Sequence, residues 1–231
     1  MLKTIGLIGG MSWESTIPYY RQINQLIKEK LGGLHSAKIM LLSVDFHEIE
    51  QWQQQGDWQA AGALLASAAA TLEKAQVDFL VLCTNTMHKV APEIEAAVGI
   101  PLLHIADPTA LAIKRAGFKK IGLLGTKFTM EQSFYRDRLI NQHGLEVIVP
   151  NDDERELVHR VIYEELCLGI VLPRSRLGYR QVIENLIAQG AQAIILGCTE
   201  ISLLVDAEDA SVPLFDTTAL HAAAAAEMAL A

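Results

Sequence analysis

Phe79–Thr84 (FLVLCT) is a short apolar run that ends in a polar residue, and a similar run recurs about half the chain later as Ala193–Cys198 (AIILGC). Two further pairs of segments recur in the same order: Ile5–Gly10 (IGLIGG) with Ile121–Thr126 (IGLLGT), and Ile100–Leu103 (IPLL) with Val212–Phe215 (VPLF). One such pair would be attributed to chance, because apolar strands that end in glycine resemble one another. Three pairs in register favour a duplication, so we predict two similar halves.

Short apolar runs alternate with longer helical patterns in both halves, which is typical of βα units and parallel sheets. The predicted fold class is α/β, with two pseudo-symmetric doubly wound parallel-sheet domains and the active site in the cleft between them. We expect residues 1–100 plus 213–231 to form the first domain and residues 101–212 the second. The predicted strands are Thr4–Ile8, Lys38–Val44, Asp78–Cys83, Pro101–His104, Lys120–Leu124, Glu146–Val149, Ala193–Leu196 and Pro213–Phe215.

The composition narrows the class of protein. The 231 residues carry 19 basic and 27 acidic side chains, a net charge of −8, which argues against nucleic-acid binding. No apolar run reaches the ~18 residues of a membrane-spanning helix. The three cysteines form no C-x-x-C pair and are too few for a disulfide framework. We therefore expect a cytoplasmic protein with a small-molecule substrate and without a nucleic-acid or membrane partner.

Ligands of parallel sheets bind beyond the carboxyl ends of the strands, so the loops there are candidate sites. Gly9–Thr16 combines glycines and hydroxyls before a helix, which suits an anion at a helix N-terminus, with an ordinary capped turn as an equal alternative. Thr84–His88 places polar side chains directly after a buried strand, which favours a carboxylate-binding nest over a capping turn. His88 either orients this loop or caps it. The spacing of the histidines indicates no metal site.

The cysteines have different expected roles. Cys198 stands where the repeat places Thr84, at a strand end before a possible helix start, where a thiol pKa can be lowered. A small buried hydrophobe is the alternative for Cys198, and the repeat favours a reactive thiol. Cys83 aligns with Gly197, and alternation along a strand turns its side chain away from that of Thr84, so we expect it to be structural. Cys167 is interpreted as a residue near a helix end.

With these motifs the chain resembles the aspartate/glutamate racemase family, whose members racemise amino acids without pyridoxal phosphate. The resemblance rests on Gly9–Met11, Thr84–His88 and Gly197–Glu200, is supported by Gly125–Met130 and Ile162–Leu166, and runs nearly end to end. It implies two pseudo-symmetric α/β halves with the active site between them, which agrees with the internal repeat.

The family uses two cysteines, one on each side of the substrate, and this chain departs from that pattern. Thr84 occupies the first cysteine position, while Cys198 keeps the second. Many relatives also have a lysine where this chain has Cys167. The resemblance implies that the Cys198 thiolate removes the α-proton of L-aspartate or L-glutamate. A threonine hydroxyl has no ionised form near neutral pH and is a poor first base, so we expect a preference for the L-enantiomer.

The implied enzyme is a racemase of acidic amino acids without a cofactor or metal, and a homodimer is expected because it is the commonest oligomer. Two alternatives stay open: a decarboxylase of malonate-type acids that uses a single cysteine, and an amino-acid-binding protein that has lost catalysis. Asn85, Thr86 and Thr199 are expected to stabilise charge on the α-carboxylate of the substrate. Gln53, on a loop, is a candidate to bind the amino or side-chain group of the substrate. The implied catalytic residues are Cys198 and Thr84, and the implied substrate-binding residues are Met11, Ser12, Gln53, Asn85, Thr86 and Thr199.

Overall fold

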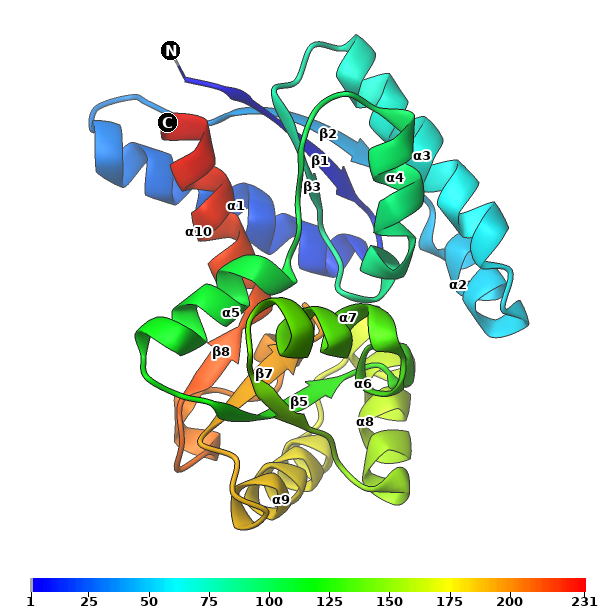
Figure 1. Ribbon diagram of the computed structural model, residues 1–231, viewed down its shortest axis with the longest axis vertical. Coiled ribbons are helices and arrows are strands. Elements are labelled where there is room, and N and C mark those ends of the chain that lie inside the picture. Colours follow the sequence, from blue (N-terminus) through cyan, green and yellow to red (C-terminus); the bar gives the residue numbers. More distant parts are fainter. Residues whose placement is uncertain (1) are drawn as a thin grey trace. The chain divides into compact units, whose positions relative to one another are not determined.

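The computed structural model describes residues 2–231, which form two compact units (Figure 1). The first unit contains the residues up to Ile105 together with His221–Ala231, and the second is Ala106–Leu220. The chain therefore passes from the first unit to the second after Ile105 and returns after Leu220. Each unit is built around its own four-stranded parallel sheet.

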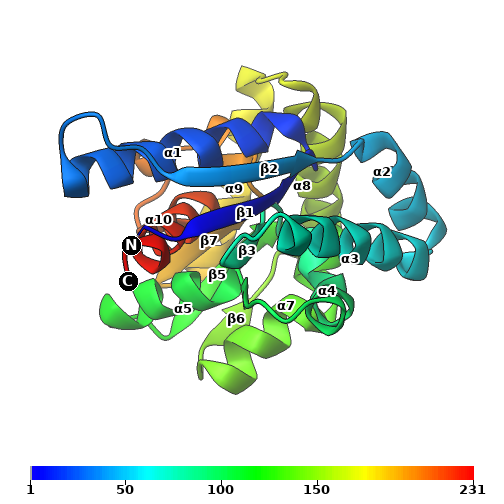
Figure 2. The same cartoon turned by 90° about the horizontal axis from the view of Figure 1, so that it is seen from above.

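The first unit has the strand order β2-β1-β3-β4, of which Figure 2 shows β2, β1 and β3 side by side. All pairings are parallel, and Ile8 of β1 lies opposite Leu82 of β3. Its strands are β1 (Thr4–Gly9), β2 (Lys38–Ser43), β3 (Phe79–Leu82) and β4 (Leu102–Leu103). Its helices are α1 (Trp13–Leu31), α2 (Phe46–Gln55), α3 (Trp58–Lys74), the 3-10 helix η1 (Thr86–Val90), α4 (Ala91–Ala97) and most of α10 (Thr217–Leu230).

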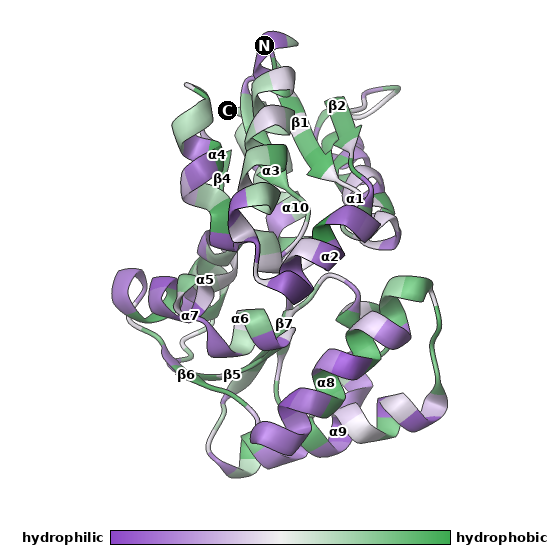
Figure 3. Cartoon of the chain, turned by 90° about the vertical axis from the view of Figure 1, so that its right-hand side faces the viewer, coloured by the Kyte–Doolittle hydropathy of each residue, from purple (hydrophilic) through white to green (hydrophobic). Residues whose placement is uncertain are grey.

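Helices cover both faces of this first sheet, because alternate strand residues point to opposite sides. Leu80 and Leu82 pack in one apolar cluster with residues of α2, α3 and α4. Phe79, Val81 and Cys83 pack in a second cluster with residues of α1 and α10. Figure 3 shows β1 and β2 in the hydrophobic colour, whereas α2 is largely hydrophilic. The continuously apolar β3 is thus explained by burial on both faces.

The second unit repeats this topology, with the strand order β6-β5-β7-β8 and parallel pairing throughout. Leu124 of β5 lies opposite Leu196 of β7, in the position that Ile8 and Leu82 have in the first unit. Its strands are β5 (Lys120–Gly125), β6 (Glu146–Ile148), β7 (Ala193–Gly197) and β8 (Leu214–Asp216). Its helices are α5 (Ala106–Arg115), α6 (Lys127–Glu131), α7 (Ser133–Asp137), the π-helix η2 (Arg138–Gln142), α8 (Asp152–Glu164), α9 (Pro173–Ala188) and the 3-10 helices η3 (Leu166–Leu168), η4 (Ile201–Leu203) and η5 (Ala207–Asp209).

Two similar parallel-sheet halves confirm the predicted fold class, but the division of the chain differs from the prediction. The expected change of domain fell before the strands at 101–104 and 213–215. In the structure β4 pairs with β3, and β8 pairs with β7, so each of these strands completes the sheet that precedes it. The chain consequently changes unit after residues 105 and 220, later than the predicted 100 and 212.

Two helical segments also differ from the prediction. Gln53 is predicted on a loop, whereas it lies in α2, which Asp45 caps by accepting a hydrogen bond from the His47 amide at 3.1 Å. The helical pattern of Met130–Gln142 predicts a single helix, but the structure interrupts it at Gln132, whose backbone is extended, and continues it as α7 and η2. In both cases the stretch with helically spaced apolar residues is too short for the sequence to show where a helix begins or ends.

Candidate active site

The loop after β1 is shaped by a glycine and closed by a hydroxyl. Gly10 has a φ of +95°, and a Cβ there would lie 2.2 Å from the Val44 carbonyl oxygen, so only glycine fits. The Gly10 amide donates to Thr16 Oγ1 at 2.9 Å, and that hydroxyl donates to the Ser12 carbonyl at 3.0 Å. Ser12 is the N-cap of α1, and both Met11 and Ser12 are buried. Met11 and Ser12, two of the implied substrate-binding residues, therefore lie in a hydrogen-bonded turn at the carboxyl end of β1.

The loop after β3 separates Cys83 from Thr84. Cys83 is fully buried in the apolar cluster against α1 and α10, its Sγ donates to the Val81 carbonyl at 3.8 Å, and burial raises the pKa of its thiol. The Thr84 amide donates to the Leu82 carbonyl at 2.9 Å. Thr84 is also buried, with 7% of its surface exposed. The packing of Cys83 follows the alternation of Phe79 and Val81 before it, and the strand then ends in a turn at Cys83 that leads into Thr84.

The predicted substrate-binding residues of the first unit meet at this same loop. Asn85 is the N-cap of η1 and Thr86 begins it, and both side chains are buried. Gln53 lies in α2, not in the predicted loop, and its Nε2 donates to Met87 Sγ at 3.0 Å. The helix therefore carries Gln53 to the loop after β3. Asp45 and Gly56, which flank α2, are helix start and stop signals that could have shown this helix in the sequence.

At the carboxyl end of β7, three side chains converge on Glu200. Cys198 Sγ donates to Glu200 Oε2 at 3.0 Å, and Thr199 Oγ1 donates to the same oxygen at 2.8 Å. Cys167 Sγ donates to Glu200 Oε1 at 3.8 Å. Glu200 is only 2% exposed. Glu200 is the last residue of the Gly197–Glu200 motif and is not among the predicted site residues, although a carboxylate two residues after a candidate thiol is a sequence signal for it.

The electrostatics of Cys198 contradict one expectation. The sequence suggested a lowered thiol pKa, but burial and the charge of Glu200 raise the pKa of Cys198 well above its usual value, with Cys167 adding to the effect. The lowered pKa was expected from a helix N-terminus, whereas only the short helix η4 follows, beginning at Ile201. A raised pKa makes the thiolate scarcer at neutral pH and more basic when it forms.

The loop after β5 lies beside the end of β7, since Gly125 pairs with Gly197. A Cβ on Gly125 would lie 2.8 Å from the Gly197 carbonyl oxygen, which explains the small residues at this edge. Thr126 caps α6 by accepting a hydrogen bond from the Thr129 amide at 3.3 Å. These contacts bring the ends of β5 and β7 close together and fix the start of α6 beside them.

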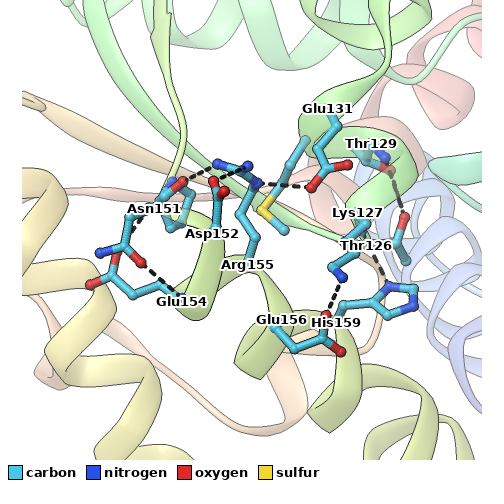
Figure 4. Close-up of polar contacts among 12 residues, drawn as sticks. Thr126, Lys127, Thr129, Glu131, Asn151, Asp152, Glu154, Arg155, Glu156 and His159 are labelled. Carbon is cyan, nitrogen blue, oxygen red and sulfur yellow. Dashed lines mark hydrogen bonds and ion pairs between the residues drawn. The ribbon is translucent and has the colours of Figure 1, made fainter.

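Ion pairs join α6 to α8 next to this edge (Figure 4). Lys127 pairs with Glu156, and the Lys127 amide donates to His159 Nδ1 at 3.2 Å. Burial lowers the pKa of His159, which suits a ring nitrogen that accepts a hydrogen bond. Arg155 bonds Glu131 at 2.9 Å on the same side of α8. We interpret this network as structural support for the edge.

Within residues 2–231, no three histidine, cysteine, aspartate or glutamate side chains are grouped so that they could hold a metal ion. None of the helices in this described range is long and apolar enough to cross a membrane.

Comparisons with known proteins identify the family. Residues 8–225 match the family model described as Asp/Glu/Hydantoin racemase. The crystal structure of a candidate Asp/Glu racemase from Yersinia pestis is 67% identical, covers 99% of this chain and 100% of that chain, and has a TM-score of 0.92. An aspartate racemase homologue from Pyrococcus horikoshii OT3 is 35% identical over 99% of this chain and 100% of that chain, with a TM-score of 0.84. The broad specificity amino-acid racemase RacX of Bacillus subtilis is 26% identical over 219 residues, 93% of each chain. The chain therefore belongs to the Asp/Glu/Hydantoin racemase family, a family of isomerases.

Proposed function

We propose that this protein racemises acidic amino acids, aspartate or glutamate, without a cofactor, and that Cys198 and Thr84 are its acid–base residues. One observation carries the proposal. Leu82 and Leu196 lie opposite equivalent residues of β1 and β5, and Thr84 and Cys198 each stand two residues further along. The two units thus offer chemically different groups at one equivalent position, next to polar side chains suited to an amino-acid carboxylate.

In the proposed reaction, the Cys198 thiolate takes the α-proton, so a C–H bond breaks, an S–H bond forms, and the electron pair stays on the substrate. Hydrogen bonds from Asn85, Thr86 and the backbone amide of Thr199, whose hydroxyl already donates to Glu200, stabilise the charge that moves onto the α-carboxylate. Removal of one such donor typically costs roughly 3–4 kcal/mol of barrier. A proton from the Thr84 hydroxyl, or from a water that Thr84 positions, then reaches the opposite face of Cα. The proton on Cys198 returns to solvent, and Thr84 or its water is reprotonated.

The remaining predicted residues complete this proposal. Met11 and Ser12 form the floor under the substrate, and the carboxamide of Gln53 binds the amino or side-chain group. The raised pKa of Cys198 acts on this step in two opposite ways, because the thiolate is a stronger base for the weakly acidic α-proton but is scarcer at neutral pH.

The inequality of Thr84 and Cys198 leads to a preference for L-substrate as the enantiomer that Cys198 deprotonates. Because the equilibrium constant of racemisation is one, kcat/KM must be equal in the two directions. The preference therefore appears in kcat and KM separately, and in the exchange of the α-hydrogen with solvent.

The experiment is incubation of L- and D-aspartate and L- and D-glutamate in deuterated water, with chiral analysis and α-deuterium content measured together. We expect deuterium at Cα of the inverted product, no carbon dioxide, and loss of both signals in Cys198→Ala. Cys83→Ala is the matched control and should retain turnover per folded molecule. Carbon dioxide release from malonate-type acids would indicate the decarboxylase, and binding without α-exchange would indicate a binding protein. Unchanged turnover in Cys198→Ala would refute the mechanism.

The homodimer and the cytoplasmic location stay predictions. Light scattering of the purified protein tests the first, and fractionation of cells that express it tests the second.

A further inference from the structure

The loop that carries Thr84 is tied to the rest of the first unit by a buried histidine. His88 lies in η1 and is 2% exposed. Its Nδ1 lies 2.7 Å from the carbonyl oxygen of Thr84, and its Nε2 accepts a hydrogen bond from the Ile105 amide at 3.1 Å. One imidazole therefore connects the loop after β3 to the residue at which the chain leaves the first unit.

The partners fix the protonation of this ring. A backbone amide can only donate, so Nε2 of His88 carries no proton. A carbonyl oxygen can only accept, so Nδ1 carries the single ring proton and donates it to Thr84. His88 is thus a neutral imidazole in one tautomer, and neither nitrogen can change its role without breaking a buried hydrogen bond.

Other histidines pack around this bridge. The ring centroid of His104 lies 4.4 Å from that of His88, and the ring centroid of His221 lies 6.0 Å from it. His221 Nε2 donates to the Leu103 carbonyl at 2.8 Å, and its Nδ1 bonds the Tyr19 hydroxyl at 2.9 Å. His221 is the residue at which the chain re-enters the first unit. The two points at which the chain leaves and re-enters the first unit, Ile105 and His221, therefore both lie in hydrogen bonds that involve histidines near the Thr84 loop.

We propose that His88 is a positioning residue for the reaction. Its neutral ring bridges the Thr84 carbonyl and the Ile105 amide, and this bridge determines the position of the Thr84 hydroxyl. This inference rests on the proposed function, since it assigns a role to His88 only through Thr84. A hydrogen bond at the Thr84 carbonyl restrains the backbone and so the direction of the Cα–Cβ bond that carries the hydroxyl, and misplacement of a reacting group by about 1 Å can cost roughly 100-fold in rate.

The two ring contacts can be separated by substitution. The amide of an asparagine ends near the position of Nδ1, so His88→Asn retains the donor to Thr84 and loses the acceptor for Ile105. The amide oxygen of a glutamine reaches the position of Nε2, so His88→Gln retains the acceptor and loses the donor. His35→Gln, at an exposed histidine, is the control for loss of a histidine.

The assay follows L-substrate in deuterated water and compares inversion to the D-enantiomer with deuterium entry into the remaining L-enantiomer. Deuterium entry with retention needs Cys198 alone, whereas inversion also needs the Thr84 side. We expect His88→Gln to lower kcat for inversion roughly 10–100-fold while exchange with retention and KM change little. We expect His88→Asn to keep most of the inversion rate. A merely structural role would lower exchange and inversion together.

Several outcomes would overturn the proposal. Equal losses of exchange and inversion in folded His88→Gln would do so, as would an unchanged kcat. If the glutamine variant does not fold, loss of inversion in folded His88→Asn is decisive against it, and retained inversion supports it. Wild-type protein without α-exchange would instead refute the proposed function itself. Long-range proton–nitrogen spectra, with His88→Asn for assignment, test the geometry without turnover: a His88 ring protonated at Nε2 at neutral pH would contradict it.

Discussion

Replacement of Glu200 by glutamine removes the charge beside the Cys198 thiol while keeping the size of the side chain and an acceptor oxygen. In the wild type, a thiolate would stand 3.0 Å from Glu200 Oε2. Two unit charges at that separation repel by roughly 5 kcal/mol at an effective dielectric constant of about 20. Relaxation of both side chains reduces this, so we expect Glu200→Gln to lower the pKa of Cys198 by about 1–3 units.

The measurement is the rate of alkylation of Cys198 by iodoacetamide as a function of pH, followed on the separated peptide by mass spectrometry. A shift of that size raises the neutral-pH rate roughly 10–1,000-fold. Cys83 in the same digest is the internal control, and Glu184→Gln, at an exposed glutamate of α9, is the control for loss of a negative charge. The acid limb of kcat/KM should move to lower pH together with the alkylation curve. An unchanged or higher alkylation midpoint would show that Glu200 does not govern this thiol.

Three further changes test other parts of the structure. Cys83→Ser places a hydroxyl in an apolar cluster and should lower the free energy of unfolding, measured by urea denaturation, by about 1–3 kcal/mol. Turnover should be retained in the folded protein. Complete loss of activity without loss of stability would mean that the register assigned to this strand is wrong. Thr84→Cys should raise kcat from the D-enantiomer roughly tenfold or more, because a thiolate is then available on that face, and equal initial rates before and after the change would show that threonine is no handicap. Burial alone would raise the pKa of Asp107, but hydrogen bonds from Arg138 and His143 outweigh it and lower that pKa. Asp107 therefore stabilises the fold above about pH 4, and this contribution is lost as the pH falls further. Denaturation at two pH values should show that the stability difference between wild type and Asp107→Asn becomes smaller in acid, and a constant difference would contradict the assignment.

Local patterns in the sequence were sufficient for the fold and for part of the site. Continuous apolar runs such as Phe79–Leu82 indicate strands buried on both faces, and the repeat of these runs predicts two sheets of like topology. Alternation along the strand also places Phe79, Val81 and Cys83 in one apolar cluster, because every second side chain points to the same face of a sheet. These properties depend on residues close together in the chain, so they can be read without coordinates.

The contacts that set the chemistry join residues far apart in the chain, and only the tertiary structure decided them. The Cys167–Glu200 and His88–Ile105 hydrogen bonds connect segments whose separation in sequence carries no periodic signal. The pKa of Cys198 was expected to fall from its place at a strand end, and it rises because folding buries the thiol against a carboxylate. Burial and the distance between charges depend on how the chain packs, whereas the periodicity of apolar residues is a property of the sequence itself. The sequence by itself therefore determined the strands, their repeat and the face of the sheet to which each strand side chain points. Packing decided the pKa of Cys198 and the hydrogen bonds that hold the loops at the strand ends.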